Sequence, residues 1–312
     1  MLTLEKFEEA SERLNRVLLE TKLVYSDYFS EKTGAKVYFK PENMQFTGAY
    51  KLRGAYYKIS TLTQEERERG IISASAGNHA QGVAYAAKLI GAKAVIVMPT
   101  STPLIKVNRT KGYGAEVILH GDVYDDACAY ALELAEEKGY TFIHPFNDEI
   151  VATGQGTIAM EIIPTVDYIL VPIGGGGLCC GVSTLAKMLN PKIKVIGVEP
   201  AGAACMKASL AAGHVVTLPK VTTIADGTAV KTPGDVVFPY IQENVDDIIT
   251  VEDDDLIAAF LDMMENHKMI VENSGLLTVA ALKQMDIRGK KVVSILSGGN
   301  MDVITIASVV QN

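Results

Sequence analysis

Short runs of apolar residues alternate along the chain with longer amphipathic stretches. In the first segment, apolar residues recur at steps of three and four, which predicts a helix over residues 4–17. Helical periodicity also marks longer segments such as 122–138 and 253–267. Between the helical segments, β-prone runs predict strands at 37–39, 71–73, 94–98, 116–119, 141–144, 168–173, 195–198, 247–251 and 291–296. This order of strands and helices predicts an α/β fold with mainly parallel sheets.

Several of the predicted strands are apolar throughout, without the alternation of apolar and polar residues that marks a strand with one solvent-exposed face. AVIVM at 94–98 and YILVPI at 168–173 are the clearest examples. Such strands are typical of sheets covered on both faces. The strands are more numerous than one compact open sheet usually holds, so we expect two sheets. The pattern does not say how the strands divide between them.

Composition and charge narrow the class of protein. The 312 residues are 48% hydrophobic, which is enough for two domains or one large one. A net charge of −8 argues against binding to nucleic acid or to an anionic membrane. No apolar run is long enough to span a membrane. The four cysteines, Cys128, Cys179, Cys180 and Cys205, lack metal-ligand spacing, so we expect reduced thiols and a cytoplasmic protein.

Four consecutive glycines, at positions 174–177, join an apolar strand to a helical pattern. Bare N–H groups at a helix N-terminus form a cradle for a phosphate. The loop lacks the Gly-Lys-Ser/Thr ending of a P-loop and the glycine spacing of a dinucleotide-binding fingerprint. We therefore favour a phosphate site held by backbone alone over a plain strand-to-helix turn.

Three other segments carry candidate chemistry. Lys51 opens a helical segment, where the helix dipole and apolar surroundings would lower its pKa and favour an amine nucleophile; the alternative is an ordinary surface lysine. The turn at 75–79 can present N–H donors to a carboxylate, or can simply cap a helix. The segment 297–300, SGGN, follows a buried strand and can equally be a glycine turn.

Taken together, these segments resemble the fold-type II pyridoxal-phosphate enzymes. FTGAYKLRGA around Lys51, SAGNHAQG at 75–82, GGGGL at 174–178 and SGGN at 297–300 occur in the order found in that family. TGQGTIAMEI at 153–162 and TIADG at 223–227 also fit. Within the family the chain is most similar to the threonine dehydratases (threonine ammonia-lyases), with the serine racemases second. The resemblance covers nearly the whole chain.

The resemblance implies an architecture. A small domain, residues 46–144, would be inserted into a large domain made of residues 1–45 plus 145–312. The cofactor, pyridoxal 5′-phosphate, would lie in the cleft between two open, mainly parallel sheets. Homodimers or homotetramers are usual in the family. Because the chain ends soon after SGGNMDV, we expect no C-terminal regulatory domain.

The resemblance also assigns roles to residues. Lys51 would bind the cofactor covalently and act as the catalytic base, and Tyr50 would pack against the cofactor. Asn78 would contact the phenolic oxygen and Ser297 the pyridine nitrogen. The phosphate would be bound by Gly174, Gly175, Gly176, Gly177 and Leu178. The substrate carboxylate would be bound by Ser75, Gly77, Asn78 and His79.

The activity implied is conversion of L-threonine to 2-oxobutanoate and ammonium, and of L-serine to pyruvate and ammonium, in isoleucine biosynthesis or threonine catabolism. The β-hydroxyl leaves as water, and hydrolysis of the released enamine takes up one water, so the net loss is ammonium alone. A neutral hydroxyl at Ser297 leaves the cofactor ring a weaker electron sink, which suits elimination. Serine racemase is the alternative, but Ala76 stands where racemases carry a second serine. A non-catalytic amino-acid or nucleotide binding protein would need no chemistry at Lys51. Racemases also bind a metal through a Glu and an Asp; because Cys205 follows Glu199 at the Asp position, we expect no metal.

Overall fold

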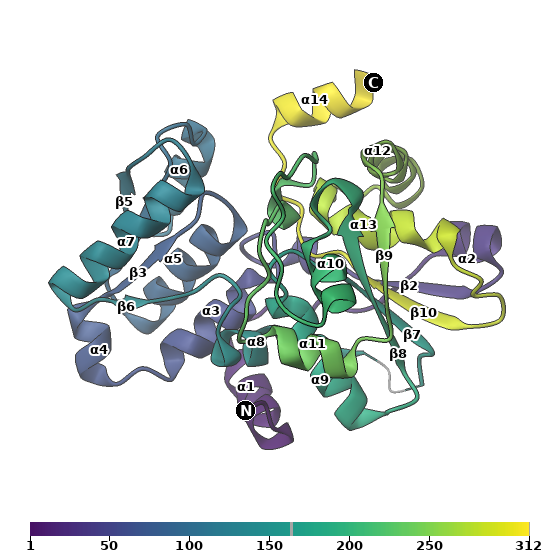
Figure 1. The fold of residues 1–312 in the computed structure, drawn as a ribbon, viewed down its shortest axis with the longest axis horizontal. Helices are drawn as coiled ribbons and strands as arrows, with labels where there is room; N and C mark the ends of the chain where they lie inside the picture. The colour runs from purple at the N-terminus through teal and green to yellow at the C-terminus, as the bar shows by residue number, and fades with distance from the viewer. Residues whose placement is uncertain (163–164, 312) are drawn as a thin grey trace.

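The computed structural model describes residues 1–162 and 165–311 and contains two separate β-sheets (Figure 1). The larger sheet has six strands in the order β1-β2-β10-β7-β8-β9. β1 is antiparallel to β2, and the other neighbours are parallel. The bounds are Val24–Tyr25 (β1), Lys36–Lys40 (β2), Tyr168–Pro172 (β7), Lys194–Pro200 (β8), Asp247–Val251 (β9) and Lys291–Ile295 (β10).

The smaller sheet has four strands, all parallel, in the order β5-β4-β3-β6. These strands are Ile71–Ala74 (β3), Ala94–Met98 (β4), Glu116–Leu119 (β5) and Thr141–Phe142 (β6). All four come from one continuous part of the chain, between the strands β2 and β7 of the larger sheet. The predicted α/β class with two mainly parallel sheets is confirmed.

Helices cover both faces of the larger sheet, which explains why its strands are apolar without alternation. Ile169 and Val171 of β7 lie in one core cluster, while Leu170 between them lies in the other. The first cluster packs under α1 (Leu4–Leu14), α8 (Glu149–Gly156), α9 (Gly177–Leu189), α10 (Cys205–Ala212) and α11 (Phe238–Asn244). The second packs under α2 (Asp27–Thr33), α12 (Asp253–Asp262), α13 (Asn273–Ala281) and α14 (Val303–Gln311).

The smaller sheet is covered in the same way. One face packs against α3 (Lys51–Ser60), α5 (Asn78–Ile90) and α6 (Leu104–Gly112), and the other against α7 (Tyr124–Lys138). The short helix α4 (Gln64–Arg69) leads into β3. Successive residues of β3 again divide between the two faces, with Ile71 in one cluster and Ile72 in the other.

The predicted elements differ from the observed ones mainly at their ends. β4, β5 and β9 have the predicted bounds, but β6 stops at Phe142 because the imidazole of His144 accepts hydrogen bonds from Phe146 N and Asn147 N and turns the chain. The two-residue strand β1 was not predicted, because so short a run leaves no periodicity. Among the described residues, no helix is both long and apolar enough to cross a membrane.

Candidate functional site

The loop in front of Lys51 is attached to the end of β10, so it lies where the strands of the larger sheet end. Tyr50 N donates to Ser297 O at 3.1 Å, and Gly299 N donates to Gly48 O at 2.9 Å. Between these bonds, Ala49 and Gly298 form an antiparallel bridge. Ligands of open α/β sheets bind at the carboxyl ends of the strands. Lys51 therefore lies at the position where the fold usually places a ligand.

Lys51 is the first residue of α3 and is partly buried. Its Nζ donates to the carbonyl oxygen of Pro145 at 2.6 Å and lies 5.4 Å from the centre of the Tyr50 ring. Burial lowers the pKa of Lys51 to about 8, against the opposing charge of Glu272. A large share of this amine is therefore neutral near pH 8, as a nucleophile or a base requires.

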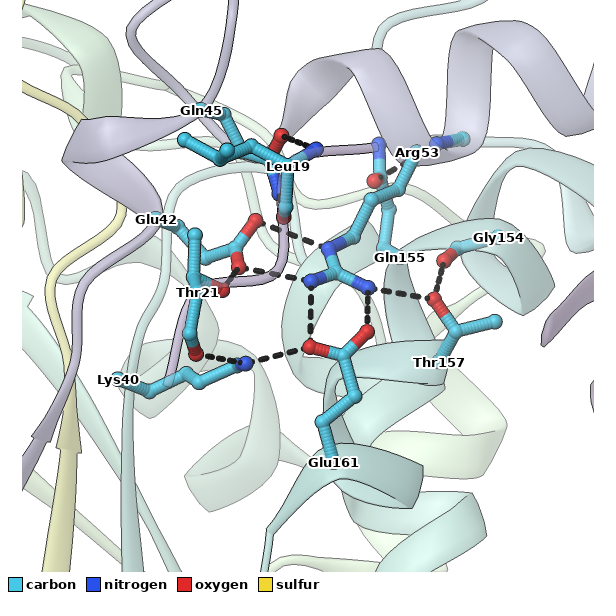
Figure 2. Close-up of polar contacts among 11 residues, drawn as sticks. Leu19, Thr21, Lys40, Glu42, Gln45, Arg53, Gly154, Gln155, Thr157 and Glu161 are labelled. Carbon is cyan, nitrogen blue, oxygen red and sulfur yellow. Dashed lines mark hydrogen bonds and ion pairs between the residues drawn. The ribbon is translucent and has the colours of Figure 1, made fainter. Parts of the chain in front are cut away.

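A buried ionic network fixes helix α3 close to Lys51 (Figure 2). The Arg53 guanidinium, fully buried, donates to both carboxylate oxygens of Glu42 at 2.8 and 2.9 Å and to both of Glu161 at 2.7 and 3.0 Å. It also donates to the Thr157 hydroxyl at 3.1 Å, and Lys40 pairs with Glu161. Burial raises the pKa of Glu161, but the hydrogen bonds and charges of Arg53 and Lys40 outweigh it and hold this pKa below its usual value. The network joins α3, the helix that carries Lys51, to Glu42, which precedes the strands of the smaller sheet in the chain, and to Glu161, which follows them.

Glycines allow α3 to lie directly against its neighbours. A Cβ on Gly54 would come within 2.6 Å of Val151 O, and one on Gly154 within 2.7 Å of Arg53 O. On the other side, a Cβ on Gly82 of α5 would lie 3.1 Å from Leu52 N. The GQG part of TGQGTIAMEI therefore has a packing role, which places α8 against α3.

The four consecutive glycines at 174–177, which we call the glycine loop, offer N–H groups at the start of α9. The N–H groups of residues 175–179 have no acceptor in the described part of the chain, and the first bond of the helix runs from Cys180 N to Gly176 O at 2.8 Å. Gly176 has φ of +104°, which side chains rarely adopt. Such an array of free donors at a helix N-terminus fits a phosphate. Leu178 in the first turn is buried, and its side chain belongs to the core.

Phe146 connects the glycine loop to Lys51. A Cβ on Gly175 would lie 2.3 Å from the Phe146 ring, and a Cβ on Gly177 would lie 2.8 Å from Phe146 O. The preceding residue, Pro145, accepts the hydrogen bond from Lys51. Gly174 lies on the other side of the loop, against the backbone of Thr228. The loop thus requires glycine for packing as well as for its bare N–H groups.

The turn at residues 75–79, which we call the asparagine loop, presents a second set of donors at the start of α5. The N–H groups of Asn78, His79 and Ala80 have no acceptor among the residues described, and Gly77 N donates to the Ser75 hydroxyl at 3.2 Å. The His79 side chain points elsewhere: its Nε2 donates to Ile143 O at 2.9 Å. Burial and the nearby Lys51 charge lower the pKa of His79 to about 3, so the ring is neutral. Any contact of His79 with a carboxylate would therefore use its backbone N–H.

Two further residues lie at the site: Asn300, the last residue of the SGGN segment, had been assigned no role, and Glu272 lies outside every segment that the sequence analysis singled out. The carboxylate of Glu272, buried at the start of α13, accepts from Asn78 Nδ2 at 2.6 Å. The Asn300 side chain donates to Asn78 Oδ1 at 2.8 Å. Ser297, 3% exposed, precedes this group at the end of β10. Both contacts join residues far apart in the chain, which a local pattern does not reveal.

Glu199 and Cys205, the two residues at the positions of the racemase metal ligands, lie at the start of helix α10. The Glu199 carboxylate accepts from Met206 N and Lys207 N, both at 2.8 Å, and so caps the helix. Burial raises the pKa of Glu199 to about 7, against these hydrogen bonds. No cluster of three or more metal-ligating side chains occurs within residues 1–162 and 165–311.

The chain is similar to proteins of one family. The family model described as "Pyridoxal-phosphate dependent enzyme" matches residues 15–298. An L-threonine ammonia-lyase of Thermotoga maritima is 46% identical over 314 aligned residues, covering 99% of this chain and 78% of the relative. Among solved structures, threonine deaminase isoform 2 of Solanum lycopersicum has a TM-score of 0.93 and 39% identity, covering 99% of this chain and 94% of that one. Maize serine racemase has a TM-score of 0.94 and 37% identity, covering 99% and 96%.

The geometry and the comparisons agree. A lysine with a lowered pKa lies near two helix N-termini with free donors, in the fold of these relatives: it bonds Pro145, whose neighbour Phe146 packs against the start of α9, and its charge acts on His79 at the start of α5. The chain belongs to the family of pyridoxal-phosphate dependent enzymes of fold type II, and its cofactor is pyridoxal 5′-phosphate.

Proposed function

We propose that the protein is an L-threonine ammonia-lyase, which converts L-threonine to 2-oxobutanoate and ammonium and L-serine to pyruvate and ammonium. The observation that carries the proposal is the position of the Lys51 amine near two helix N-termini, each with free donors. One suits a phosphate and the other a carboxylate. Relatives of high identity are L-threonine ammonia-lyases.

The residues present can hold the cofactor. The N–H groups at Gly174 to Leu178 would bind its phosphate, and Lys51 would bind it covalently. Asn78 would donate to its phenolic oxygen and Ser297 would face its ring nitrogen, with Tyr50 packed beside it. When bound, pyridoxal phosphate supplies the electron-withdrawing system that acidifies the α-carbon of an amino acid.

The other functional residues orient the substrate and move its proton. The free N–H groups at the start of α5 and the Ser75 hydroxyl would bind the substrate carboxylate, together with Gly77. The Lys51 Nζ would take the α-proton, because an amine with a pKa of about 8 is both available and basic near neutral pH.

Serine racemase is the second candidate, favoured by the likeness to the maize enzyme. Racemisation needs a second acid–base group on the face opposite the lysine. Ala76, which is partly exposed in the asparagine loop, has no exchangeable proton. We therefore infer that elimination prevails and that little D-serine is formed from L-serine.

The proposal also covers the domain organisation, the oligomeric state and the location of the protein in the cell. Residues 46–144, which contain the four-stranded sheet, would form a small domain that closes over substrate against residues 1–45 and 145–312. The enzyme would be a homodimer or homotetramer in the cytoplasm, where its four free cysteines stay reduced. Light scattering coupled to gel filtration measures the assembly directly.

Keto-acid release from L-threonine, L-serine and D-serine tests the function. We expect turnover of both L-amino acids and little of D-serine. Chiral chromatography of the L-serine reaction separates lyase from racemase: D-serine in amounts comparable to pyruvate would favour the racemase. A colourless protein that releases no keto acid after addition of pyridoxal phosphate would instead be a binding protein.

A further inference from the structure

Glu272 lies inside the candidate site but has no role in the proposed chemistry. It is the N-cap residue of α13, with no hydrogen bond from its side chain to the helix, and its own N–H donates to Gly298 O at 3.0 Å. Its side chain is 6% exposed. A carboxylate buried this deeply is costly unless it is hydrogen-bonded. The partners that it has therefore indicate what it does.

The Glu272 carboxylate belongs to a closed ring of hydrogen bonds. Oε1 accepts from Asn78 Nδ2 at 2.6 Å, and Oε2 accepts from Asn300 N at 3.3 Å. The Asn300 side-chain amide donates to Asn78 Oδ1 and to Thr47 O, both at 2.8 Å. The ring thus joins the starts of α5 and α13, the end of β10 and the loop before Lys51.

This ring fixes the orientation of the Asn78 amide. An ionised carboxylate only accepts hydrogen bonds, so the amide must turn its NH₂ group toward Glu272 and its oxygen toward Asn300. Rotating the amide by half a turn would set two acceptors and two donors against each other. One N–H of Asn78 is used by Glu272, and the other has no acceptor in the part of the chain that is described. That free N–H belongs to the residue expected at the phenolic oxygen of the cofactor.

The surrounding backbone is shaped to admit the carboxylate. A Cβ on Gly298 would lie 2.4 Å from Glu272 Oε1 and 3.0 Å from Asn78 Nδ2. Glycine at the second position of SGGN therefore makes room for this contact, directly after Ser297. Burial raises the pKa of Glu272 to about 7, and the charge of Asp226 adds to the rise. The Asn78 and Asn300 hydrogen bonds and the Lys106 charge oppose it, and Lys51 also faces the carboxylate.

We propose that Glu272 is a positioning residue, which orients the Asn78 amide so that its second N–H is available to the cofactor. The proposal rests on the proposed function, because it assumes that pyridoxal phosphate binds beside Asn78. A hydrogen bond to a charged group is worth roughly tenfold or more in a binding constant. Loss of the carboxylate should therefore weaken cofactor binding chiefly through Asn78.

A double-mutant cycle tests this coupling. The Kd of pyridoxal 5′-phosphate for the full-length apoprotein is measured at pH 8 for wild type, Glu272→Gln, Asn78→Ala and the double variant. We expect Glu272→Gln to raise the Kd about tenfold in the wild-type background and less than about twofold with Asn78→Ala. An equal effect in both backgrounds would show that Glu272 does not act through Asn78, and would overturn the proposal.

Glu199→Gln is the matched control. Glu199 is fully buried and has a similarly raised pKa, but its carboxylate accepts hydrogen bonds from Met206 N and Lys207 N, away from Asn78. Its effect on the Kd should be the same with and without Asn78→Ala. If Glu272→Gln does not fold, Asn300→Ala removes the opposite side of the ring and should show the same coupling to Asn78.

The pH dependence gives a second readout. Near pH 6 the carboxylate of the wild type is itself largely protonated, so the difference in Kd between wild type and Glu272→Gln should shrink. A difference that is unchanged from pH 6 to pH 8 would contradict a role for the charge. If wild type binds no pyridoxal phosphate and releases no keto acid, the proposed function fails. If wild type binds and turns over but the cycle is additive, only the role of Glu272 fails.

Discussion

Removing the Arg53 guanidinium should destabilise the protein severely. The Arg53→Met substitution keeps most of the side-chain volume but removes five hydrogen bonds, to Glu42, Glu161 and Thr157. Within the described residues, it leaves the fully buried Glu42 with the Thr21 hydroxyl as its one remaining side-chain partner. Breaking a buried ion pair by removing one partner costs about 3–5 kcal/mol. That is a large share of the roughly 5–15 kcal/mol by which a typical domain is stable.

Denaturant unfolding of the apoprotein, followed by circular dichroism, measures this loss of stability. The double variant Glu42→Met with Arg53→Met removes both charges, so it should be more stable than the sum of the two single substitutions. Arg69→Met is the control, because Arg69 forms an exposed pair with Glu65 and should cost less than about 1 kcal/mol. A loss below about 1 kcal/mol for Arg53→Met, or strict additivity in the double variant, would refute the reasoning.

Three other predictions concern the site itself. Gly175→Ala should weaken cofactor binding because its Cβ would displace the Phe146 ring, whereas the control Gly112→Ala places its Cβ in open space and should not. Equal affinities of the two variants in a fluorescence titration would contradict the assignment of the glycine loop as the phosphate site. Ala76→Ser should introduce measurable D-serine formation, and chiral chromatography showing none would mean that a hydroxyl there is not enough. Between pH 8 and 10.5 the unfolded chain binds more protons at Lys51 than the folded apoprotein does, so stability should rise with pH, and Lys51→Met should abolish this rise in denaturant midpoints.

The elements of the fold were largely predictable because their signals are local. The run AVIVM gives the bounds of β4 directly, since every residue of that strand is buried. The helical segment predicted to begin at Lys51 is confirmed as α3. β1 could not be predicted, because two residues that pair with β2 carry no periodic pattern. The division of strands between two sheets depends on pairings that the sequence does not encode locally.

The site was predictable only where a backbone feature marks it. Consecutive glycines and a strand-to-helix turn reveal the N–H groups of the two loops. Arg53 and Glu272 had no such mark, because a charged residue in a helical segment usually faces solvent. Glu272 meets Asn78 at a separation of 194 residues, and Arg53 meets Glu161 at 108. Those partners are brought together by tertiary packing alone.

The central claim is that Lys51 makes this protein a threonine ammonia-lyase that depends on pyridoxal phosphate. The most direct measurement is release of 2-oxobutanoate and ammonium from L-threonine by wild type and by Lys51→Ala, both supplied with pyridoxal phosphate and matched in circular dichroism. The account predicts equal amounts of the two products from wild type and loss of turnover by at least about a thousandfold in the variant. A well-folded Lys51→Ala protein that releases 2-oxobutanoate at the wild-type rate would contradict it.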